Sequence, residues 1–176
     1  MKKERNIAFI DAQNLHLWTT TEKWIVDFKR FRIYLEKKYN VDEAHIFLWF
    51  VDDNHQSLYR KIQKAGFILI FREHHTAMKW KKKWNVDVDI VYEIMHRLLE
   101  EDDFNKIVLV TGDWDYIKLV KYLIDKNRFE KILFPNKYHS SLYKQIETMY
   151  RNNLSLLDIR KKIEKITIKK EVSLGN

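Results

Sequence analysis

Three short stretches of this chain place acidic side chains at or just after apolar residues. They read FIDAQNL at residues 9–15, NVDVDIVYEI at 85–94 and VLVTGDWDYIKLV at 108–120. A single aspartate after an apolar run often caps a helix, because its carboxylate accepts a hydrogen bond from an unpaired backbone N–H group. Several aspartates that meet at one place repel one another, and a hard cation removes that penalty. The stretches can therefore be separate helix caps or parts of one metal site.

The first and third stretches carry further polar groups beside their aspartates. Asp11 ends an apolar run and Asn14 follows three residues later, so a carboxylate and an amide oxygen can face one point beyond a strand. In the third stretch Asp113 and Asp115 can both reach outward, and Thr111 adds a hydroxyl group. For Asp11 or Asn14 taken alone, a helix cap is the commoner role.

The second stretch has helical spacing, so its acids fall on a predicted helix. An aspartate at the start of that helix, Asp87, is stabilised by the positive end of the helix dipole, and this leaves its role open. Asp89 and Glu93 stand four residues apart on one helical face, where like charges repel unless water or a cation screens them. A structural role is favoured for this pair.

A metal site built from these residues would offer oxygen ligands alone. If Asp11, Asp87, Asp113 and Asp115 converge, their carboxylates suit Mg²⁺ or Mn²⁺ better than zinc, and the chain has no HExxH spacing. Such ions lower the pKa of a bound water and neutralise charge that develops on a phosphodiester. The predicted chemistry is metal-assisted phosphodiester hydrolysis.

Strand-like and helix-like stretches alternate along the chain, and they decide whether these acids can meet. Strands are predicted over 6–10, 45–51, 67–71, 107–110 and 131–134, and helical patterns over 28–39, around 58–66, and over 86–99, 116–124 and 142–157. Strands separated by helices predict an α/β fold with a central, mostly parallel five-stranded sheet and helices on both faces. Ligands bind such sheets at the carboxyl ends of the strands, where the strand order reverses. The aspartates are expected to gather there.

Composition and charge limit the class of protein. The chain has 176 residues, of which 45% are hydrophobic and 33% charged, as expected for one folded domain. Thirty-three Lys and Arg against 25 Asp and Glu give a net charge of +8, which favours polyanionic partners. The chain has no cysteine, and no stretch predicts a membrane span or a signal peptide. We expect a cytoplasmic protein without a membrane partner.

The three acidic stretches, in this order and spacing, resemble the motifs of the NYN domain, a branch of the PIN-like nucleases. The segment FPNKYHSSLYKQ at 134–145 resembles the part of the family after its last core strand, and the resemblance covers roughly residues 6–158. It implies a single PIN-like α/β domain, dependence on Mg²⁺ or Mn²⁺, and hydrolysis of RNA. The residues that match the family's metal ligands are Asp11, Asp87, Asp113 and Asp115, with Asn14 and Thr111 at polar positions near the metal.

The chain departs from the family's usual motifs at two places. Trp84 and Asn85 stand where relatives often have Lys-Gly, and Trp114 stands where a second glycine is common. The first change alters the expected hold on the substrate phosphate, and the second can narrow the site or offer a stacking surface. Neither change removes a carboxylate.

The segment HHTAMKWKKKW at residues 74–84 is basic and aromatic, and we predict that it binds RNA. Its lysines can contact phosphates and its tryptophans can stack on unpaired bases, as in single-stranded nucleic-acid sites. Tryptophans four residues apart can also fold back onto the core if the segment is helical. The residues predicted to bind RNA are Lys79, Trp80, Lys81, Lys82, Lys83 and Trp84.

The leading hypothesis is a metal-dependent ribonuclease that acts on single-stranded or loop RNA. In it Asp11, Asp87, Asp113 and Asp115 bind the ions, with Asn14, Thr111 and Asp89 in supporting positions. Residues 1–158 are predicted to form the domain and 159–176 a charged helical tail.

The alternative is an RNA-binding or scaffolding protein that keeps the nuclease fold without turnover. A phosphate-transfer enzyme or a receiver domain is a third possibility, because an acid after the first strand serves those too. A receiver is disfavoured, since Arg72 and Glu73 follow the third strand where a phosphoacceptor aspartate is expected. Apolar residues on an outer helix leave a homodimer open.

Overall fold

The computed structural model describes residues 5–49, 51, 53–72, 86–100, 103–137 and 141–166. Its strands are β1 (Asn6–Asp11), β2 (Val41–Leu48), β3 (Ile68–Phe71), β4 (Ile107–Val110), β5 (Phe129–Phe134) and β6 (Arg151–Asn153). Its helices are α1 (Ala12–Thr21), α2 (Phe28–Tyr39), α3 (Gln56–Lys64), α4 (Asp87–Leu99), α5 (Ile117–Asp125) and α6 (Leu157–Ile163). The strands pair in the order β3-β2-β1-β4-β5-β6, and every pair of neighbours is parallel.

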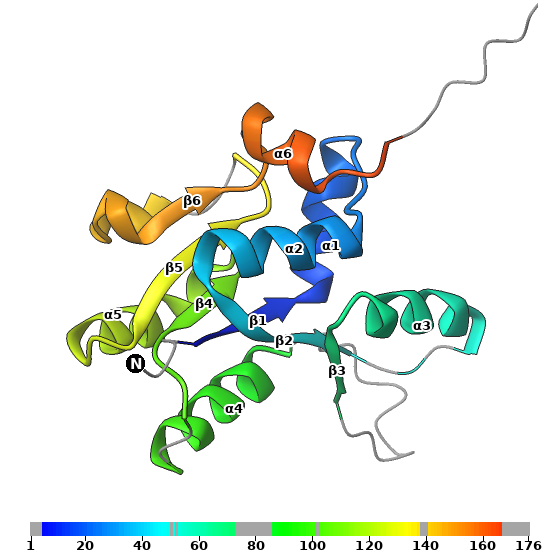
Figure 1. Cartoon of the computed structure of the whole chain (residues 1–176). Coiled ribbons are helices and arrows are strands. Elements are labelled where there is room, and N and C mark those ends of the chain that lie inside the picture. Colours follow the sequence, from blue (N-terminus) through cyan, green and yellow to red (C-terminus); the bar gives the residue numbers. More distant parts are fainter. Residues whose placement is uncertain are drawn as a thin grey trace, which may run out of the picture.

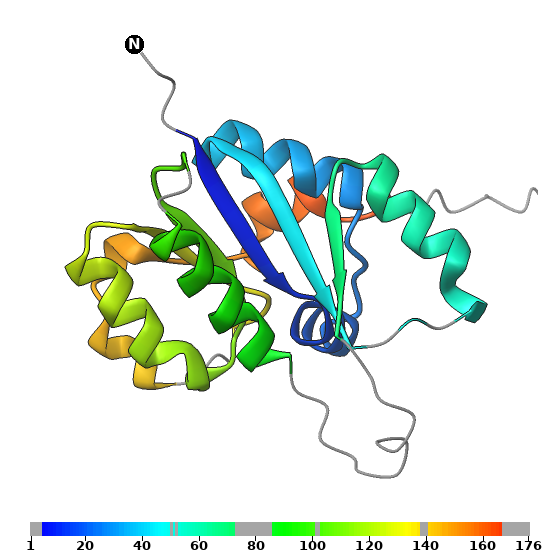
Figure 2. The ribbon, with the colours of Figure 1, turned by 90° about the horizontal axis from the view of Figure 1, so that it is seen from below.

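Two apolar layers cover the sheet. Figure 1 shows α1, α2 and α6 on one side of the sheet and α4 on the other, and Figure 2 shows α4 beside α5. All residues of the central strands β1 and β4 are buried, because helices cover both faces of these strands. One layer packs around Phe31, Leu35 and Ile62, and the other around Ile90, Ile94 and Val120. The predicted α/β class with a parallel sheet and helices on both faces is confirmed.

The sheet has six strands and not the five that the sequence predicts. The additional strand, β6, contains the residues RNN and pairs only with the edge of β5. It has no apolar residue, so it is held by backbone pairing and by a hydrogen bond from the Asn153 Nδ2 to the Asn136 carbonyl oxygen, at 2.8 Å. Such a short polar strand carries no hydrophobic period that a sequence pattern can reveal.

The predicted helix over 142–157 is wrong. This segment forms two short 3₁₀ turns, Ser141–Gln145 and Thr148–Tyr150, before β6 and then α6. Tyr143 and Ile146 lie in the core, as the apolar spacing predicts. After them the chain turns so that β6 can pair with the edge of β5. Burial of two side chains three apart is satisfied equally well by a 3₁₀ turn.

The end of the described chain packs on the domain. Ile159 and Ile163 of α6 are buried in the same apolar layer as Phe31, and α6 lies against α2. The division of the chain after residue 158 stays a prediction. Among the described residues, none of the helices is long and apolar enough to cross a membrane.

Candidate metal centre

The acidic residues lie where the strand order of the sheet reverses. From β1 the chain continues to β2 and β3 on one side, whereas β4, β5 and β6 extend on the other. β1 and β4 are parallel neighbours. After their carboxyl ends the chain continues toward opposite sides of the sheet, which leaves space between the side chains at this edge. Asp11 ends β1, and Asp113 and Asp115 follow β4.

Three of the predicted carboxylates converge at this edge. Asp87, Asp113 and Asp115 each offer one oxygen, and the three oxygens lie within 4.8 Å of one another. Asp87 and Asp113 are half-buried and Asp115 is exposed, so the group is held from one side and open to solvent on the other. Carboxylate oxygens in an open group suit a hard divalent cation that keeps some water ligands. The three carboxylates can therefore hold a divalent cation.

Asp87 is the first residue of α4, where the positive end of the helix dipole favours its negative charge. The Tyr116 hydroxyl donates a hydrogen bond to the Asp87 Oδ1 at 2.6 Å. Tyr116 is fully buried, so this bond fixes the carboxylate against a rigid wall of the core. Burial raises the pKa of the Tyr116 hydroxyl, and the negative charges of Asp11 and Asp87 raise it further, so the tyrosine stays a donor.

Asp113 acts as a cap and as a member of the acidic group. Its Oδ1 accepts a hydrogen bond from the Asp115 backbone N–H at 3.1 Å, which begins the 3₁₀ turn Trp114–Tyr116. Its own N–H donates to the Thr111 Oγ1 at 3.1 Å, and the Tyr143 hydroxyl donates to its carbonyl oxygen at 2.5 Å. The backbone of this loop is thus held at three points. The other carboxylate oxygen remains available for a ligand.

Asn14 ties the first acidic segment to the third. Its Oδ1 accepts a hydrogen bond from the Gly112 N–H at 2.7 Å. A Cβ atom at Gly112 would lie 3.4 Å from that oxygen and 3.8 Å from the Trp18 Nε1, which are ordinary van der Waals distances. The supporting role of Asn14 in orienting water or phosphate stays a prediction.

Asp11 is buried beside the group. It is 5% exposed, and its Oδ1 accepts a hydrogen bond from the Asn14 N–H at 2.9 Å, which caps α1. Burial raises the pKa of the Asp11 carboxyl to about 7, and the charges of Asp87 and Asp113 contribute, although the backbone hydrogen bonds oppose the shift. Asp11 stands outside the three residues whose oxygens lie within 4.8 Å. Its role as a metal ligand stays a prediction.

The remaining predicted residues fall into two sets. Asp89 is half-buried and lies 3.7 Å from the Arg72 Nε, an ion pair that suits the structural role favoured for it. The residues predicted to bind RNA, Lys79, Trp80, Lys81, Lys82, Lys83 and Trp84, lie outside the described part of the chain. Trp114, between the two aspartates of the third stretch, is 55% exposed.

The sequence reasoning missed Tyr116 and Tyr143, which hold Asp87 and the backbone of Asp113. Tyr116 follows Asp115 directly, and a tyrosine inside an acidic stretch could have been recognised as a hydrogen-bond donor. Tyr143 lies 30 residues from Asp113, and its contact depends on the 3₁₀ turn that the sequence did not predict.

The parallel sheet and the aspartates at the reversal of its strand order define an α/β fold with a candidate metal centre. The model of the family described as NYN domain matches residues 6–167. The chain belongs to the NYN domain family, within the PIN-like nuclease superfamily.

One solved structure supports this fold. The crystal structure of a protein of unknown function from Vibrio parahaemolyticus is similar to this chain with a TM-score of 0.72 and 16% sequence identity. The similarity covers 93% of this chain and 97% of that protein. No curated protein matches the chain.

Proposed function

We propose that this protein is a metal-dependent ribonuclease that hydrolyses phosphodiester bonds of single-stranded or loop RNA. The observation that carries the proposal is the convergence of Asp87, Asp113 and Asp115 within 4.8 Å at the edge of a nuclease-type fold. Like charges at this separation are unfavourable without a cation. The net charge of +8 favours a polyanionic substrate, and RNA is the polyanion that the family resemblance implies.

The proposed ligands of Mg²⁺ or Mn²⁺ are Asp87, Asp113 and Asp115, with Asp11 as a fourth carboxylate. When bound, the cation supplies Lewis-acid chemistry, since it offsets charge on the phosphate and makes a water easier to deprotonate. Tyr116 keeps Asp87 in one orientation, and Thr111 and Asn14 hold the loop that carries Asp113. Held carboxylates lose little freedom when they bind, which favours a defined substrate position.

Asp11 can exchange a proton within this site near neutral pH. With a pKa of about 7, its carboxyl group is partly protonated there. A nearby positive charge favours the ionised form, so loss of this proton and binding of the ion are coupled. Asp89 has a supporting role through its ion pair with Arg72. Lys79, Lys81, Lys82 and Lys83, with Trp80 and Trp84, are proposed to hold the RNA strand.

A second candidate is an RNA-binding protein without turnover. It is favoured by Trp114, which is 55% exposed between two of the proposed ligands and can stack on a base over the acidic group. This candidate predicts RNA binding that survives metal removal and no cleavage with any cation. The two candidates therefore differ in one assay.

The test is cleavage of end-labelled single-stranded RNA with Mn²⁺, with Mg²⁺ and with EDTA. Wild type is compared with Asp113→Asn and with Asp125→Asn, which removes the same charge at the exposed far end of α5. We expect metal-dependent cleavage by wild type and by Asp125→Asn, and none by Asp113→Asn. Cleavage by Asp113→Asn at the wild-type rate would exclude the proposed site, and RNA binding without cleavage by wild type would favour the second candidate.

A further inference from the structure

A large apolar cavity lies beside α1, the helix that follows Asp11. It has a volume of about 870 Å³ and is formed by α1, the segment between α1 and α2, the end of β2, and α3. This volume is in the range of sites that bind small molecules and cofactors. Asp11 caps α1, and the next two residues, Ala12 and Gln13, already line the cavity. The cavity therefore begins at the first turn of the helix that Asp11 caps.

The walls of the cavity are rich in aromatic rings. Six of the residues that line it carry one, and these are His16, Trp24, Phe28, Trp49, His55 and Tyr59. Flat rings bind other flat rings by stacking, and base stacking on aromatic side chains is the common way in which proteins hold unpaired nucleotides.

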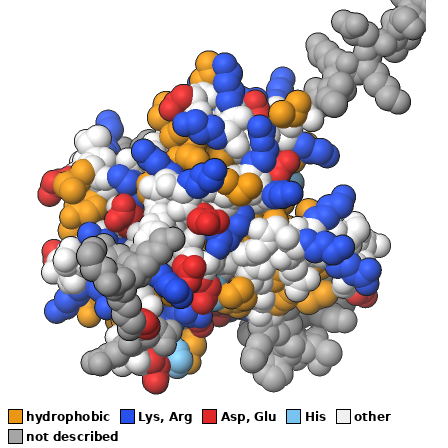
Figure 3. Space-filling model, in the orientation of Figure 1, with side chains coloured by type: hydrophobic (Ala, Val, Ile, Leu, Met, Phe, Trp, Pro, Cys, Tyr) orange, Lys and Arg blue, Asp and Glu red, His pale blue; other side chains and the backbone are white. Residues whose placement is uncertain are grey.

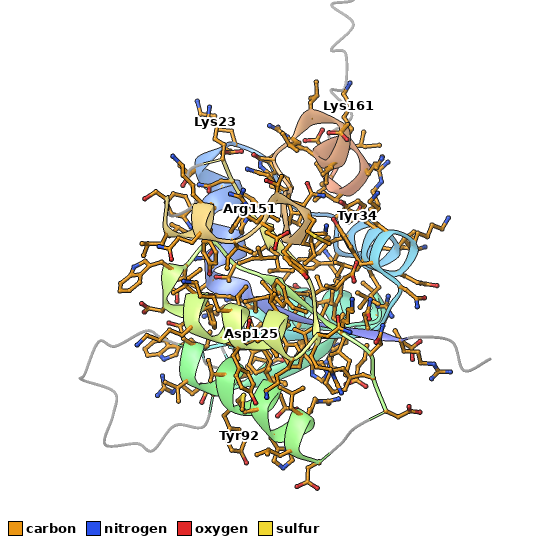
Figure 4. The ribbon with its side chains drawn as sticks, turned by 90° about the vertical axis from the view of Figure 1, so that its left-hand side faces the viewer. Lys23, Tyr34, Tyr92, Asp125, Arg151 and Lys161 are labelled. Atoms are coloured by element: carbon orange, nitrogen blue, oxygen red, sulfur yellow. The ribbon has the colours of Figure 1, made fainter. Side chains whose placement is uncertain are left out.

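The charges around the cavity suit a polyanion. No described residue that lines the cavity is an aspartate or a glutamate, whereas Lys23 does line it. The adjoining helix α3 presents Arg60, Lys61 and Lys64 to solvent and contains no acidic residue. Figure 3 shows blue side chains over the surface of this part of the molecule, and Figure 4 shows Lys23 pointing outward near the end of α1. An apolar site with aromatic rings and one lining cation, Lys23, can take a base with a phosphate beside it.

We propose that this cavity binds an unstacked nucleobase of the RNA strand whose backbone passes the acidic group. The inference rests on the proposed function for the identity of the strand, and it deepens that function by adding a base site. It restricts the substrate to RNA that can turn a base out of its stack, because a paired base cannot enter a cavity lined by helices. The phosphates on either side of that base would face Lys23 and the cations of α3.

The test is a binding measurement in EDTA with a fluorescently labelled single-stranded RNA oligomer and the same oligomer with abasic positions. Leu58→Glu places a carboxylate in the cavity, where Leu58 is 40% exposed. Ile33→Glu is the matched control, since Ile33 is 41% exposed on α2 and does not line the cavity. A paired variant of the exposed residues at the cavity mouth, His16→Ala with His55→Ala, serves if Leu58→Glu fails to fold.

We expect Leu58→Glu to weaken binding of the intact oligomer about tenfold or more, and the histidine pair to weaken it about fivefold, since each stacked base contributes a factor of this order. Ile33→Glu is expected to change it less than about twofold. The abasic oligomer should bind wild type about tenfold more weakly than the intact one, and Leu58→Glu should bind both alike. Equal preference for the intact oligomer in wild type and Leu58→Glu would overturn the base site.

Two further readouts separate the base site from its rivals. If wild type cuts RNA with Mn²⁺ but binds intact and abasic oligomers equally, the base site is wrong and the ribonuclease stands. If it never cuts but shows base-dependent binding that Leu58→Glu removes, the ribonuclease is wrong and the base site stands. A dimeric wild type that Leu58→Glu turns into a monomer, with RNA binding unchanged, would assign the cavity to a second copy of the chain and overturn the proposal.

Discussion

The carboxylates near the two ends of α4 differ in the groups that surround their negative charge. At its C-terminal end the Arg97 guanidinium lies 2.8 Å from a Glu43 oxygen and 2.9 Å from a Glu93 oxygen, and Glu43 also hydrogen-bonds His45. At its N-terminal end Asp87 meets the carboxylates of Asp113 and Asp115. Within the described part of the chain, Asp113 and Asp115 have no ion-pair partner.

This difference separates a structural use of acids from a functional one. The Arg97 guanidinium pairs with both Glu43 and Glu93, so these two carboxylates share a cation that the chain itself supplies. Burial lowers the pKa of His45, so its imidazole is neutral above acidic pH and adds no second charge there. In the proposed function, the group at the other end of the helix takes its cation from solution. Stability should depend on the first group, and metal-dependent activity on the second.

The largest expected effect is a difference in cleavage rate between two variants of α4, each of which replaces a carboxylate by a neutral amide. Asp87→Asn should reduce cleavage at least about 1000-fold, because several kcal/mol of charge stabilisation by the ion depend on its ligands. Glu93→Gln should leave the cleavage rate within about twofold of wild type and cost about 1 kcal/mol of unfolding free energy, since one partly exposed pair is weakened. Cleavage rates and urea unfolding check both. Equal losses of activity in the two variants would erase the contrast between the helix ends.

The burial of Asp11 predicts how the stability of the protein depends on pH. Its folded-state pKa of about 7 lies above the ordinary value of 3.8, so the folded protein holds a proton that the unfolded chain has released. Without metal, its contribution to stability is therefore fully present below about pH 4 and is lost as the pH rises to about 7, by on the order of 4 kcal/mol. Asp11→Asn should remove this loss and Mg²⁺ should reduce it. Urea unfolding of both proteins from pH 4 to pH 8 in EDTA measures the difference, and identical curves would contradict the raised pKa.

Arg97→Gln tests the structural end of α4. It leaves Glu43 and Glu93 without the cation between them, at a site where the Arg97 side chain is only 19% exposed. We expect a loss of about 2 kcal/mol of unfolding free energy, below the cost of breaking a fully buried pair. The affinity for Mn²⁺ should not change. A calorimetric titration with Mn²⁺ checks this, and a large fall in affinity would show that the two groups are coupled through the helix.

The smallest expected effect concerns the hydroxyl group that orients Asp87. Tyr116→Phe removes its hydrogen bond and should cost about 1 kcal/mol of stability and weaken Mn²⁺ binding severalfold. Tyr34→Phe is the matched control, because the Tyr34 hydroxyl bonds to that of Tyr39 in the other apolar layer. Figure 4 labels Tyr34. If both variants bind Mn²⁺ like wild type, Tyr116 has no part in the metal centre beyond stability.

Much of the fold follows from apolar runs and caps along the chain. The buried runs ending at Ile10 and Val110 predict the two central strands, and the apolar spacing from Phe28 to Tyr39 predicts α2. β6 and the 3₁₀ turns could not be predicted, because their conformation depends on pairing with β5 and on packing near Phe134. Local patterns do not contain such long-range contacts.

The candidate site likewise has features that the sequence predicts and features that it does not. The acidic types and their order predict that Asp87, Asp113 and Asp115 meet, because strand ends share one edge in a parallel sheet. The sequence does not contain the depth at which each acid lies. Asp11 reads like the other three aspartates, yet it is buried and its pKa is about 7. The cavity beside α1 was also missed, since its walls come from separate elements whose apolar residues look like ordinary core.

The most direct test of the central claim is an anomalous difference map from crystals of wild type and of Asp113→Asn grown with Mn²⁺. The carboxylates within 4.8 Å of one another predict a manganese peak among Asp87, Asp113 and Asp115 in wild type, and none in the variant. The network of Glu43, Glu93 and Arg97 should show no peak in either crystal. A wild-type crystal without manganese at the three aspartates, from protein that still cuts RNA with Mn²⁺, would contradict the account.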